Sequence, residues 1–448
     1  MDAIDAWHAL LRPDVELSRR YAEDFAASMR ARKLTFGDRV HCPFLRPFFL
    51  TEADESRMRV AAETIAALGE RVTSAALQTP ALFNQLGLTD AEAQLVRIDP
   101  GYDRASTASR LDAFLLPDSL HFAEYNAESP AGLGYTQRLC ELFEELPVMQ
   151  AFRQQRRVRF NATIEPMLDA LVASYREWGG RAEPPTVAIV DWRNVPTWSE
   201  FEILRDAFTA RGVPTVVCDP REVTFENGAL MCGAARIDIV YRRVLINDIL
   251  ARMDDCAALV QAYAQRAVCV ANTFRCKLAH KKAFFAVLTD ERNEALFSDD
   301  ERALIAAHVP WTRILADTDT VLNGRRQPLL RLAEDHRDSL VLKPNDEYGG
   351  TGVKLGWETT PSDWRAALNS ALNTPSATWI IQERIPVRRE MFPTFDGAGE
   401  VTMRDMLVDF APYLYRGRMT GYLTRLSSTG LANVTSGGGQ VPAFVVGE

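Results

Sequence analysis

The sequence has few of the features that mark secreted, membrane-bound or zinc-binding proteins. Its seven cysteines are scattered, with no CxxC pair and no cluster with histidine at zinc spacing, so neither a zinc site nor a complete disulfide framework is expected. No run of about 18 apolar residues is present to form a membrane-spanning helix. The N-terminus lacks the basic and then apolar pattern of a signal peptide. We therefore expect a cytoplasmic protein with no membrane partner.

The sequence also lacks long basic stretches and the glycine-rich motif of dinucleotide-binding proteins. The formal net charge is −9, from 51 basic and 60 acidic residues, and no basic stripe is interleaved with aromatic residues. Nucleic acid is therefore not an expected partner. No GxGxxG follows the strand-like run VAIVD, so no dinucleotide site is expected there.

The chain is long enough to form several packed units. With 448 residues it exceeds one ordinary hydrophobic core, so two or three units that share a cleft are expected. Helical periodicity predicts a helical region over 1–95, and short alternating runs broken by Gly and Pro predict strands in 96–150. A strand, helix, strand rhythm predicts a Rossmann-like α/β subdomain in 151–270, and residues 271–448 are typical of an α+β region with antiparallel sheets. The fold class is α/β with an α+β part.

A glycine-rich turn follows an apolar strand in VLKPNDEYGGTGV, Val341 to Val353. Lys343 at the strand end is placed to hold a phosphate, and the N–H groups of the turn are unhindered enough to approach phosphate oxygens. The residues of the turn assigned to this role are Gly349, Gly350, Thr351 and Gly352. The segment lacks the GK[ST] of a P-loop, and a plain hairpin with a glycine turn explains it about as well.

Two further segments complete a candidate nucleotide site. Gln382 and Glu383 end the apolar strand WIIQERI, which is a suitable hinge for adenine, although a strand leaving the core gives the same pattern. Lys282 starts the helix in AHKKAFFAVL. Paired lysines usually lie on a solvated face, and only the combination with Lys343 makes Lys282 a phosphate ligand candidate.

Polar residues at alternate positions on two strands form a second candidate site. Arg110 and Asp112 share one face of SRLDAF, and Glu124 and Asn126 share one face of HFAEYNAESPAG. Two carboxylates and an amide oxygen are ligands that Mg²⁺ prefers. Arg110 is suited to stabilise a transferring phosphoryl group or an oxyanion. The alternative is a pair of polar strand ends on a solvated sheet face.

The C-terminal region supplies a third candidate site. The strand-like runs there carry Asp409, Arg416, Arg418 and Arg425, and a Val-Pro strand is preceded by Ser436, Gly437 and Gly438. Consecutive glycines suit a backbone that bends tightly or approaches a ligand, and arginine matches a substrate carboxylate with two parallel hydrogen bonds. A plain loop and structural ion pairs are the alternatives.

Taken in order, these segments resemble the circularly permuted ATP-grasp family, which includes glutathionylspermidine synthase-like proteins. The matching pieces are RLD, AEYNAESPAG, NTFRCKLAHKKAFF, VLKPNDEYGGTGV, WIIQERI and NVTSGGGQVP, from about Arg110 to Val446. The acidic and amide residues precede the lysines, as they do in the permuted family. The resemblance implies a permuted ATP-grasp fold with a Rossmann-like subdomain and a helical N-terminal region.

The resemblance also implies a role for each motif residue. Mg²⁺ ligands are expected at Asp112, Glu124 and Asn126, and a role at the reaction centre is expected for Arg110. Contacts to the ATP phosphates are expected from Lys282 and Lys343, with Gly349 to Gly352 covering the phosphates. Adenine is expected to be held by Gln382 and Glu383. Lys281 remains an alternative to Lys282. Glu128 is either a neighbour of the metal ligands or a substrate contact.

The implied activity is an ATP- and Mg²⁺-dependent ligase that joins a small-molecule or peptide carboxylate to an amine through an acyl phosphate. Two alternatives stay open at this point: a nucleotide-binding protein that is non-catalytic or regulatory, and an ATP-dependent phosphotransferase.

Overall fold

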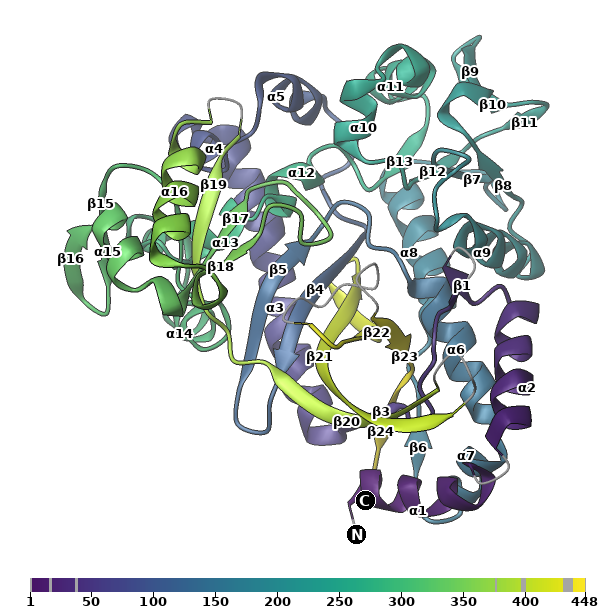
Figure 1. Cartoon of the computed structure of the whole chain (residues 1–448). Coiled ribbons are helices and arrows are strands. Elements are labelled where there is room, and N and C mark those ends of the chain that lie inside the picture. Colours follow the sequence, from purple (N-terminus) through teal and green to yellow (C-terminus); the bar gives the residue numbers. More distant parts are fainter. Residues whose placement is uncertain are drawn as a thin grey trace.

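The computed structural model describes residues 2–15, 18–36, 39–374, 377–395, 400–429 and 438–447. Three main sheets are joined by helices, as Figure 1 shows, with the large sheet at the centre, the parallel sheet at upper right and the small sheet at left. None of the helices in these ranges combines the length and apolar character needed to cross a membrane.

The large sheet collects strands from both halves of the chain. Its order is β23-β22-β21-β4-β5, with β20 paired to β21, and all the pairs are antiparallel. The strands are β4 (Ala108–Leu115), β5 (Leu120–Asn126), β20 (Arg388–Phe395), β21 (Val401–Tyr415), β22 (Arg418–Ser427) and β23 (Gly439–Val441). Residues predicted to bind metal and residues near the C-terminus therefore share one sheet.

The parallel sheet has the order β13-β12-β7-β8. Its strands are β7 (Val187–Val190), β8 (Thr215–Cys218), β12 (Ile239–Arg242) and β13 (Cys269–Ala271), with helices α8 (Ile164–Glu177), α9 (Trp198–Ala210), α10 (Ile246–Ala251) and α11 (Ala257–Ala264) nearby in the chain. Val187–Val190 and Ile239–Arg242 are buried along their whole length, as expected for parallel strands covered on both faces. A small antiparallel sheet of β9 (Val223–Glu226), β10 (Ala229–Cys232) and β11 (Ala235–Arg236) is inserted between β8 and β12.

The small sheet has the order β14-β19-β17-β18 and is antiparallel. Its strands are β14 (Thr312–Ile314), β17 (Leu340–Pro344), β18 (Lys354–Leu355) and β19 (Trp379–Glu383), and the helices of this region are α12 (Cys276–His280), α13 (Ala283–Thr289), α14 (Asp299–His308), α15 (Leu329–Asp335) and α16 (Pro361–Leu372). A separate apolar core that includes Trp364, Leu332 and Ile381 lies between this sheet and its helices. The hairpin β15 (Asp319–Leu322) and β16 (Arg325–Pro328) extends from it.

The N-terminal region contains α1 (Ala3–Val15), α2 (Ser18–Ala31), α3 (Glu52–Gln78), α4 (Pro80–Gln85) and α5 (Asp90–Arg97). It is not purely helical, because β1 (Thr35–Phe36) and β2 (Arg39–Val40) form a short pair and β3 (Phe48–Thr51) joins a further sheet. That sheet has β24 (Ala443–Val446) in the middle, parallel to β3 and antiparallel to β6 (Val158–Arg159). The short apolar run of β3 is too brief for a helix and is buried beside a strand from the other end of the chain. Helices α6 (Leu133–Glu145) and α7 (Pro147–Arg153) complete the core.

Candidate nucleotide and metal site

A cavity of about 420 Å³ lies between the large sheet and the small sheet. The large sheet lines it with Asp112, Glu124, Leu407, Asp409 and Arg425. The small sheet and its loop line it with Val341, Lys343, Gly349, Gly350, Leu355, Gln382 and Glu383. The cavity therefore brings together residues that lie up to about three hundred positions apart in the sequence.

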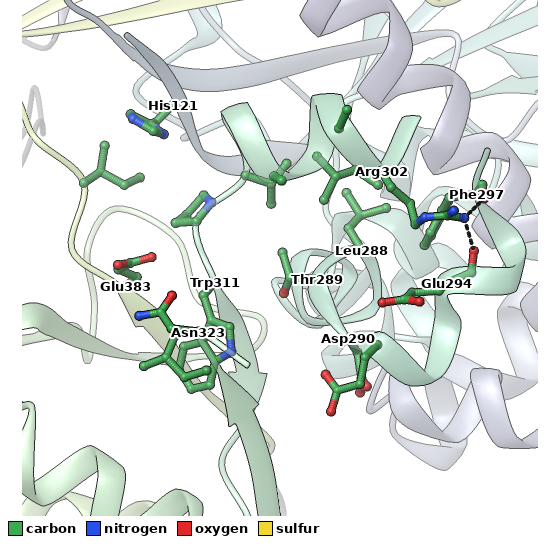
Figure 2. A pocket seen from close by; sticks show the side chains of 18 of the residues that line it. His121, Leu288, Thr289, Asp290, Glu294, Phe297, Arg302, Trp311, Asn323 and Glu383 are labelled. Atoms are coloured by element: carbon green, nitrogen blue, oxygen red, sulfur yellow. Dashed lines mark hydrogen bonds between the residues drawn. The ribbon is translucent and has the colours of Figure 1, made fainter. Parts of the chain in front are cut away.

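A second cavity, of about 780 Å³, shares the segment 383–386 with the first. Figure 2 shows His121 and Glu383 at one end of it and Glu294 and Phe297 at the other. Its acidic residues Asp290 and Glu291 are ion-paired with arginines, and no lysine lines it. Among the described residues, Lys282 and Lys343 line the smaller cavity, and Arg302 and Arg384 line the larger one.

The four polar residues of the second sequence motif lie on one face of β4 and β5. Arg110 pairs with Asn126 across the strands, and Asp112 pairs with Glu124. The Arg110 Nε donates to Asp112 Oδ1 at 2.9 Å, and the Asn126 amide donates to Glu124 Oε1 at 3.1 Å. The alternation of side chains along a strand produces this convergence. Asp112 and Glu124 line the cavity, whereas Arg110 and Asn126 are not among its lining residues.

Asp112 is held in its ionised form by two arginines. Besides Arg110, the Nη2 of Arg425 lies 2.5 Å from Asp112 Oδ2. Burial by itself would raise the pKa of Asp112, but the two guanidinium groups outweigh it and hold the pKa well below its usual range. A carboxylate that is charged at every physiological pH suits a metal ion.

Asp409 on β21 also lines the cavity, but its pKa is shifted in the direction opposite to that of Asp112. It accepts from Arg425 Nε at 2.5 Å, yet its side chain is 1 % exposed and burial raises its pKa to about 7. Among the described residues, its Oδ1 has no hydrogen-bond partner. Arg425 thus bridges Asp112 and Asp409, two buried carboxylates with different affinities for a proton.

Glu124 faces a lysine from the other side of the cavity. Its Oε2 lies 3.3 Å from Lys282 Nζ. Burial alone would raise the pKa of Glu124, but the Lys282 ammonium lowers it and the net direction is downward. Two ionised carboxylates with a neighbouring amide fit a hard divalent cation such as Mg²⁺. Within the described ranges, no group of three or more His, Cys, Asp or Glu is arranged to hold a metal, so added oxygen ligands from phosphate and water would have to complete such a site.

Of the two adjacent lysines, Lys282 lines the cavity and Lys281 does not. Lys282 sits at the N-terminal cap of α13, and its Nζ donates to the backbone oxygen of Glu347 at 2.5 Å. Lys281 is buried, with its Nζ 2.8 Å from both Glu92 and Asp346. The geometry therefore favours Lys282 as the phosphate ligand.

Lys343 ends β17 inside the cavity and is held by Gln382. Its Nζ donates to Gln382 Oε1 at 2.6 Å, while the Gln382 amide donates to Thr312 Oγ1 at 3.1 Å. Burial lowers the pKa of Lys343 from 10.5 to about 8, although Glu124 opposes that effect. Gln382 thus supports the Lys343 ammonium, and both residues line the cavity.

The predicted glycine loop and the segment predicted as a hinge both line the cavity. Gly349 and Gly350 line it with positive φ values of 65° and 78°. Thr351 and Gly352 do not line it. The hinge continues beyond Glu383 into Arg384, whose guanidinium lies 4.1 Å from the centre of the Trp357 ring. Both Arg384 and Trp357 line the cavity, so its wall contains an aromatic ring with a guanidinium packed over one face.

Further predicted residues lie outside the cavity, besides Arg110, Asn126, Thr351 and Gly352. Glu128 is 1 % exposed and bound in buried ion pairs with Arg242 and Lys277. Arg416 donates to Ser174 and Glu177, so it is a structural ion-pair residue rather than a cavity residue. Ser436 and Gly437 lie outside the described residues, and Gly438 is buried just before β23 without lining the cavity.

Sequence reasoning assigned no role to the cavity residues Arg384 and Trp357, and it placed Asp409 and Arg425 in the C-terminal candidate site rather than beside Asp112. Asp409 and Arg425 are visible in the sequence as charges within apolar strands, a pattern that indicates a buried pair. Their placement opposite Asp112 depends on β21 pairing with β4, across a separation of about three hundred residues. Trp357 follows the glycine loop, and nothing in its local sequence marks it.

Comparison with known proteins gives one family and several distant relatives. A family model described as circularly permuted ATP-grasp type 2 matches residues 116–434. A candidate glutamate–cysteine ligase of Frankia casuarinae is 23 % identical over 242 residues, which are 51 % of this chain and 25 % of that protein. An uncharacterised protein of a Synechocystis species is 24 % identical over 256 residues, which are 54 % of this chain and 50 % of that protein. The chain thus spans half or less of the length of these curated relatives.

The fold is also found in a solved structure. A glutathione synthetase-like effector from Globodera pallida, solved in the apo form, superposes with a TM-score of 0.61, covering 95 % of this chain and 96 % of that one. At 12 % sequence identity, this similarity concerns the fold alone.

Proposed function

Because the chain belongs to the circularly permuted type 2 ATP-grasp family, we propose that it is an ATP- and Mg²⁺-dependent ligase that joins a carboxylate to an amine. The predicted fold class is confirmed by this membership and by the superposition on the Globodera pallida effector. The narrower likeness to glutathionylspermidine synthase-like proteins stays a prediction.

One observation carries the proposal. Lys282 and Lys343 enter the cavity from the small sheet and its helix, while Asp112 and Glu124 enter it from the large sheet. Cations on one wall and ionised carboxylates on the other suit a triphosphate that is held directly by lysines and through a divalent cation by carboxylates. A nucleotide in this position has the hinge after Gln382 beside its base and the glycine loop beside its phosphates.

The first step transfers a phosphoryl group. A substrate carboxylate oxygen attacks the γ-phosphorus, the bond to the β-phosphate oxygen breaks, and ADP is released from the acyl phosphate. Lys282 and Lys343 neutralise the negative charge that spreads over the phosphate oxygens. Backbone N–H groups at Gly349 and Gly350 are unhindered by side chains and lie close enough to the cavity to contribute donors.

Asp112, Glu124 and Asn126 are the residues that would hold Mg²⁺, and Lys282 would then exchange its contact with Glu124 for phosphate. The ion supplies charge neutralisation between phosphate oxygens when it is bound. Arg110 and Arg425 keep Asp112 ionised and fix its orientation.

The second step forms the amide. The amine nitrogen attacks the acyl carbon, phosphate leaves with the carbon–oxygen bond electrons, and the nitrogen passes its proton to the departing phosphate. Arg425 lines the cavity and is fixed by Asp112 and Asp409, so its guanidinium is preorganised to stabilise an oxyanion, with Arg110 next to it. The glycine loop over the cavity would exclude water that hydrolyses the acyl phosphate.

The Frankia casuarinae relative indicates which substrates to test first. Its name as a candidate glutamate–cysteine ligase suggests amino acids and short peptides as both the acid and the amine. The arginines of the cavity, Arg384, Arg389 and Arg425, are suited to a second carboxylate on such a substrate.

The test is phosphate release from ATP by the purified chain, with amino acids and short peptides supplied as acids and amines in pairs. A ligase releases phosphate only when ATP, Mg²⁺, an acid and an amine are all present. ADP formed over many turnovers with an acid and no amine, with the phosphoryl group retained on the acid, would instead identify a phosphotransferase, because a ligase without amine stops after one acyl phosphate per chain. Absence of ATP binding in a thermal shift assay would reject both activities, because a ligand that binds only the folded state must raise its stability.

A further inference from the structure

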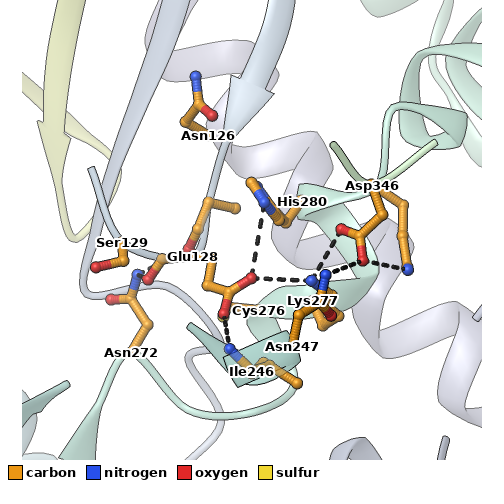
Figure 3. A network of polar contacts seen from close by, with 12 residues as sticks. Asn126, Glu128, Ser129, Ile246, Asn247, Asn272, Cys276, Lys277, His280 and Asp346 are labelled. Atoms are coloured by element: carbon orange, nitrogen blue, oxygen red, sulfur yellow. Dashed lines mark hydrogen bonds and ion pairs between the residues drawn. The ribbon is translucent and has the colours of Figure 1, made fainter. Parts of the chain in front are cut away.

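A network of buried charges lies next to the nucleotide cavity, on the side of α12. Figure 3 shows Glu128, Lys277, His280 and Asp346 at its centre. It joins elements from distant parts of the chain. Glu92 belongs to α5 and Glu128 follows β5. Lys277 lies in α12, Lys281 follows that helix, and Asp346 begins the glycine loop. None of these residues lines the cavity.

Asp346 is the carboxylate of the network that lies beside the glycine loop. Its Oδ1 lies 2.8 Å from Lys277 Nζ, and its Oδ2 lies 2.8 Å from Lys281 Nζ. The side-chain amide of Asn247, in α10, donates to Asp346 Oδ2 at 3.0 Å. Burial by itself would raise the pKa of Asp346, but the two ammonium groups outweigh it and hold the pKa far below its usual range. Asp346 is therefore a permanently charged anchor between α10 and α12.

The preceding residue, Asn345, holds the start of α13. Its Oδ1 accepts from the backbone N–H of Ala283 at 2.8 Å, and its backbone oxygen accepts from the N–H of Lys282 at 2.9 Å. Its amide donates to the Leu86 oxygen at 2.9 Å, so all of its side-chain polar atoms have protein partners. Asn345 thus connects the end of β17 directly to the residue that carries the cavity ammonium.

The two residues stand between three parts of the nucleotide site. Lys343, on β17, lies two residues before Asn345, and the backbone N–H of Lys282 donates to Asn345. The glycine loop continues from Asp346 into Glu347, whose oxygen accepts from Lys282 Nζ. A movement of the loop start would therefore separate Lys282 from Lys343. Asn345 also donates from its backbone N–H to the Thr378 oxygen at 2.9 Å, directly before β19, whereas the predicted hinge begins at the opposite end of that strand, after Gln382.

Buried ion pairs give weak net stability, because the loss of hydration of each charge offsets most of their attraction. A packed apolar cluster would stabilise this position about as well. The directional contacts of Asn345 and Asp346 fix the position of the loop, which an apolar cluster does not do.

We propose that Asn345 and Asp346 are positioning residues that set the distance between Lys282, Lys343 and the glycine loop, and thereby determine the affinity for the triphosphate. The inference rests on the proposed function, because it assumes that the cavity binds ATP. It predicts that binding of the phosphate end of the nucleotide depends on Asn345 and Asp346, and that binding of the base end does not.

The experiment compares ATP and AMP binding to the full chain by isothermal titration calorimetry in the presence of Mg²⁺. Asp346→Asn keeps the size of the side chain and removes its charge. We expect the Kd for ATP to rise about tenfold, the loss typical of a charge-assisted contact, and the Kd for AMP to change less than about twofold. Glu200→Gln is the matched control, since Glu200 is a buried carboxylate near Arg243 and away from the cavity, and it should change neither Kd.

Each outcome bears on a different claim. Equal losses for ATP and AMP, or no loss for either, in Asp346→Asn would overturn the positioning role while leaving the nucleotide site intact. A parent chain that binds neither ATP nor AMP would overturn the proposed function and the positioning role with it. If Asp346→Asn does not fold, Asn247→Ala is the second variant, because it removes one exposed hydrogen bond to Asp346. We then expect the Kd for ATP to rise about twofold and the Kd for AMP to stay unchanged.

Discussion

At the residue scale, Lys343 shows how burial adjusts a charge for its task. The side chain is enclosed by the cavity wall and donates to Gln382, and burial lowers its pKa to about 8. A lysine in this state still carries its charge at neutral pH, but it loses the proton at a pH where an exposed lysine does not.

The first prediction follows from this pKa. ATP affinity of the proposed site should fall as the pH rises through about 8, because the uncharged amine no longer attracts phosphate. The free energy of unfolding of the ligand-free protein should rise over the same range. The pKa of Lys343 is about 8 in the folded chain and 10.5 in the unfolded chain, so between these pH values the unfolded chain binds more protons and each rise in pH favours the folded state. Titration calorimetry at several pH values measures the affinity. Lys343→Arg is the control, since an arginine keeps its charge and the decline above pH 8 should disappear.

The second prediction concerns the carboxylate opposite the lysines. Glu124→Gln keeps the shape of the side chain and removes the charge that a divalent cation needs, so ATP turnover should fall by about a hundredfold or more. The measurement is phosphate release with the best acid and amine pair. Glu177→Gln is the control, since Glu177 is also ion-paired to an arginine, Arg416, but does not line the cavity. Retained turnover in Glu124→Gln would remove that residue from the proposed metal site.

At the scale of elements, the glycine loop depends on backbone conformations that other residues rarely adopt. Gly352 has a φ of 74°, and a Cβ placed there would lie 2.7 Å from Pro344 Cγ. The turn therefore packs against the end of β17, which carries Lys343. Glycine is required here both for the backbone angle and for the close approach.

The third prediction compares two glycines with the same φ. Gly352→Ala should destabilise the protein by about 2–4 kcal/mol, from backbone strain and the contact with Pro344, and should weaken ATP binding. Gly324→Ala, in the turn between β15 and β16, has the same φ of 74° and nothing within 4 Å of its Cβ, so it should cost only about 1–2 kcal/mol and leave ATP binding unchanged. Chemical denaturation and titration calorimetry measure both effects. Equal behaviour of the two variants would show that packing of the loop on β17 is unimportant.

At the scale of the whole molecule, the two ends of the sequence meet in one sheet. β24 lies between β3 and β6, and its Phe444 is fully buried. The ion pair between Arg46 and Glu390 makes a second connection from the N-terminal region to β20, with the guanidinium 3.7 Å from the Phe392 ring centre. The N-terminal region is thus part of the same folded body as the large sheet.

The fourth prediction tests this connection. Phe444→Ala should destabilise the whole protein by about 3–5 kcal/mol, because it leaves a cavity in the strand that joins β3 to β6. Unfolding should stay a single transition in urea when followed by both circular dichroism and tryptophan fluorescence. Met403→Ala on β21 is the control, since that side chain is 48 % exposed and its removal should change stability by less than about 0.5 kcal/mol. Two separate unfolding transitions, or different urea midpoints from circular dichroism and from fluorescence, would mean that the N-terminal region unfolds by itself.

The sequence by itself determined what depends on local spacing. Side chains two apart on a strand share a face, so the grouping of Arg110 with Asp112 and of Glu124 with Asn126 follows from alternation. A lysine before a glycine-rich turn indicates a phosphate site for similarly local reasons. The order of these motifs along the chain indicated the permuted family, which the family match confirms. The domain boundaries and the roles of the site residues stay predictions.

Tertiary structure alone decided what depends on distant pairing. The choice between Lys281 and Lys282 depends on Glu92 and Asp346, which bind one lysine and leave the other to the cavity. The addition of Asp409 and Arg425 to the site depends on β21 pairing with β4, and the exclusion of Arg416 depends on its contact with Glu177. No local pattern contains this information, because a side chain's partners across a sheet are set by register and packing between segments far apart in sequence.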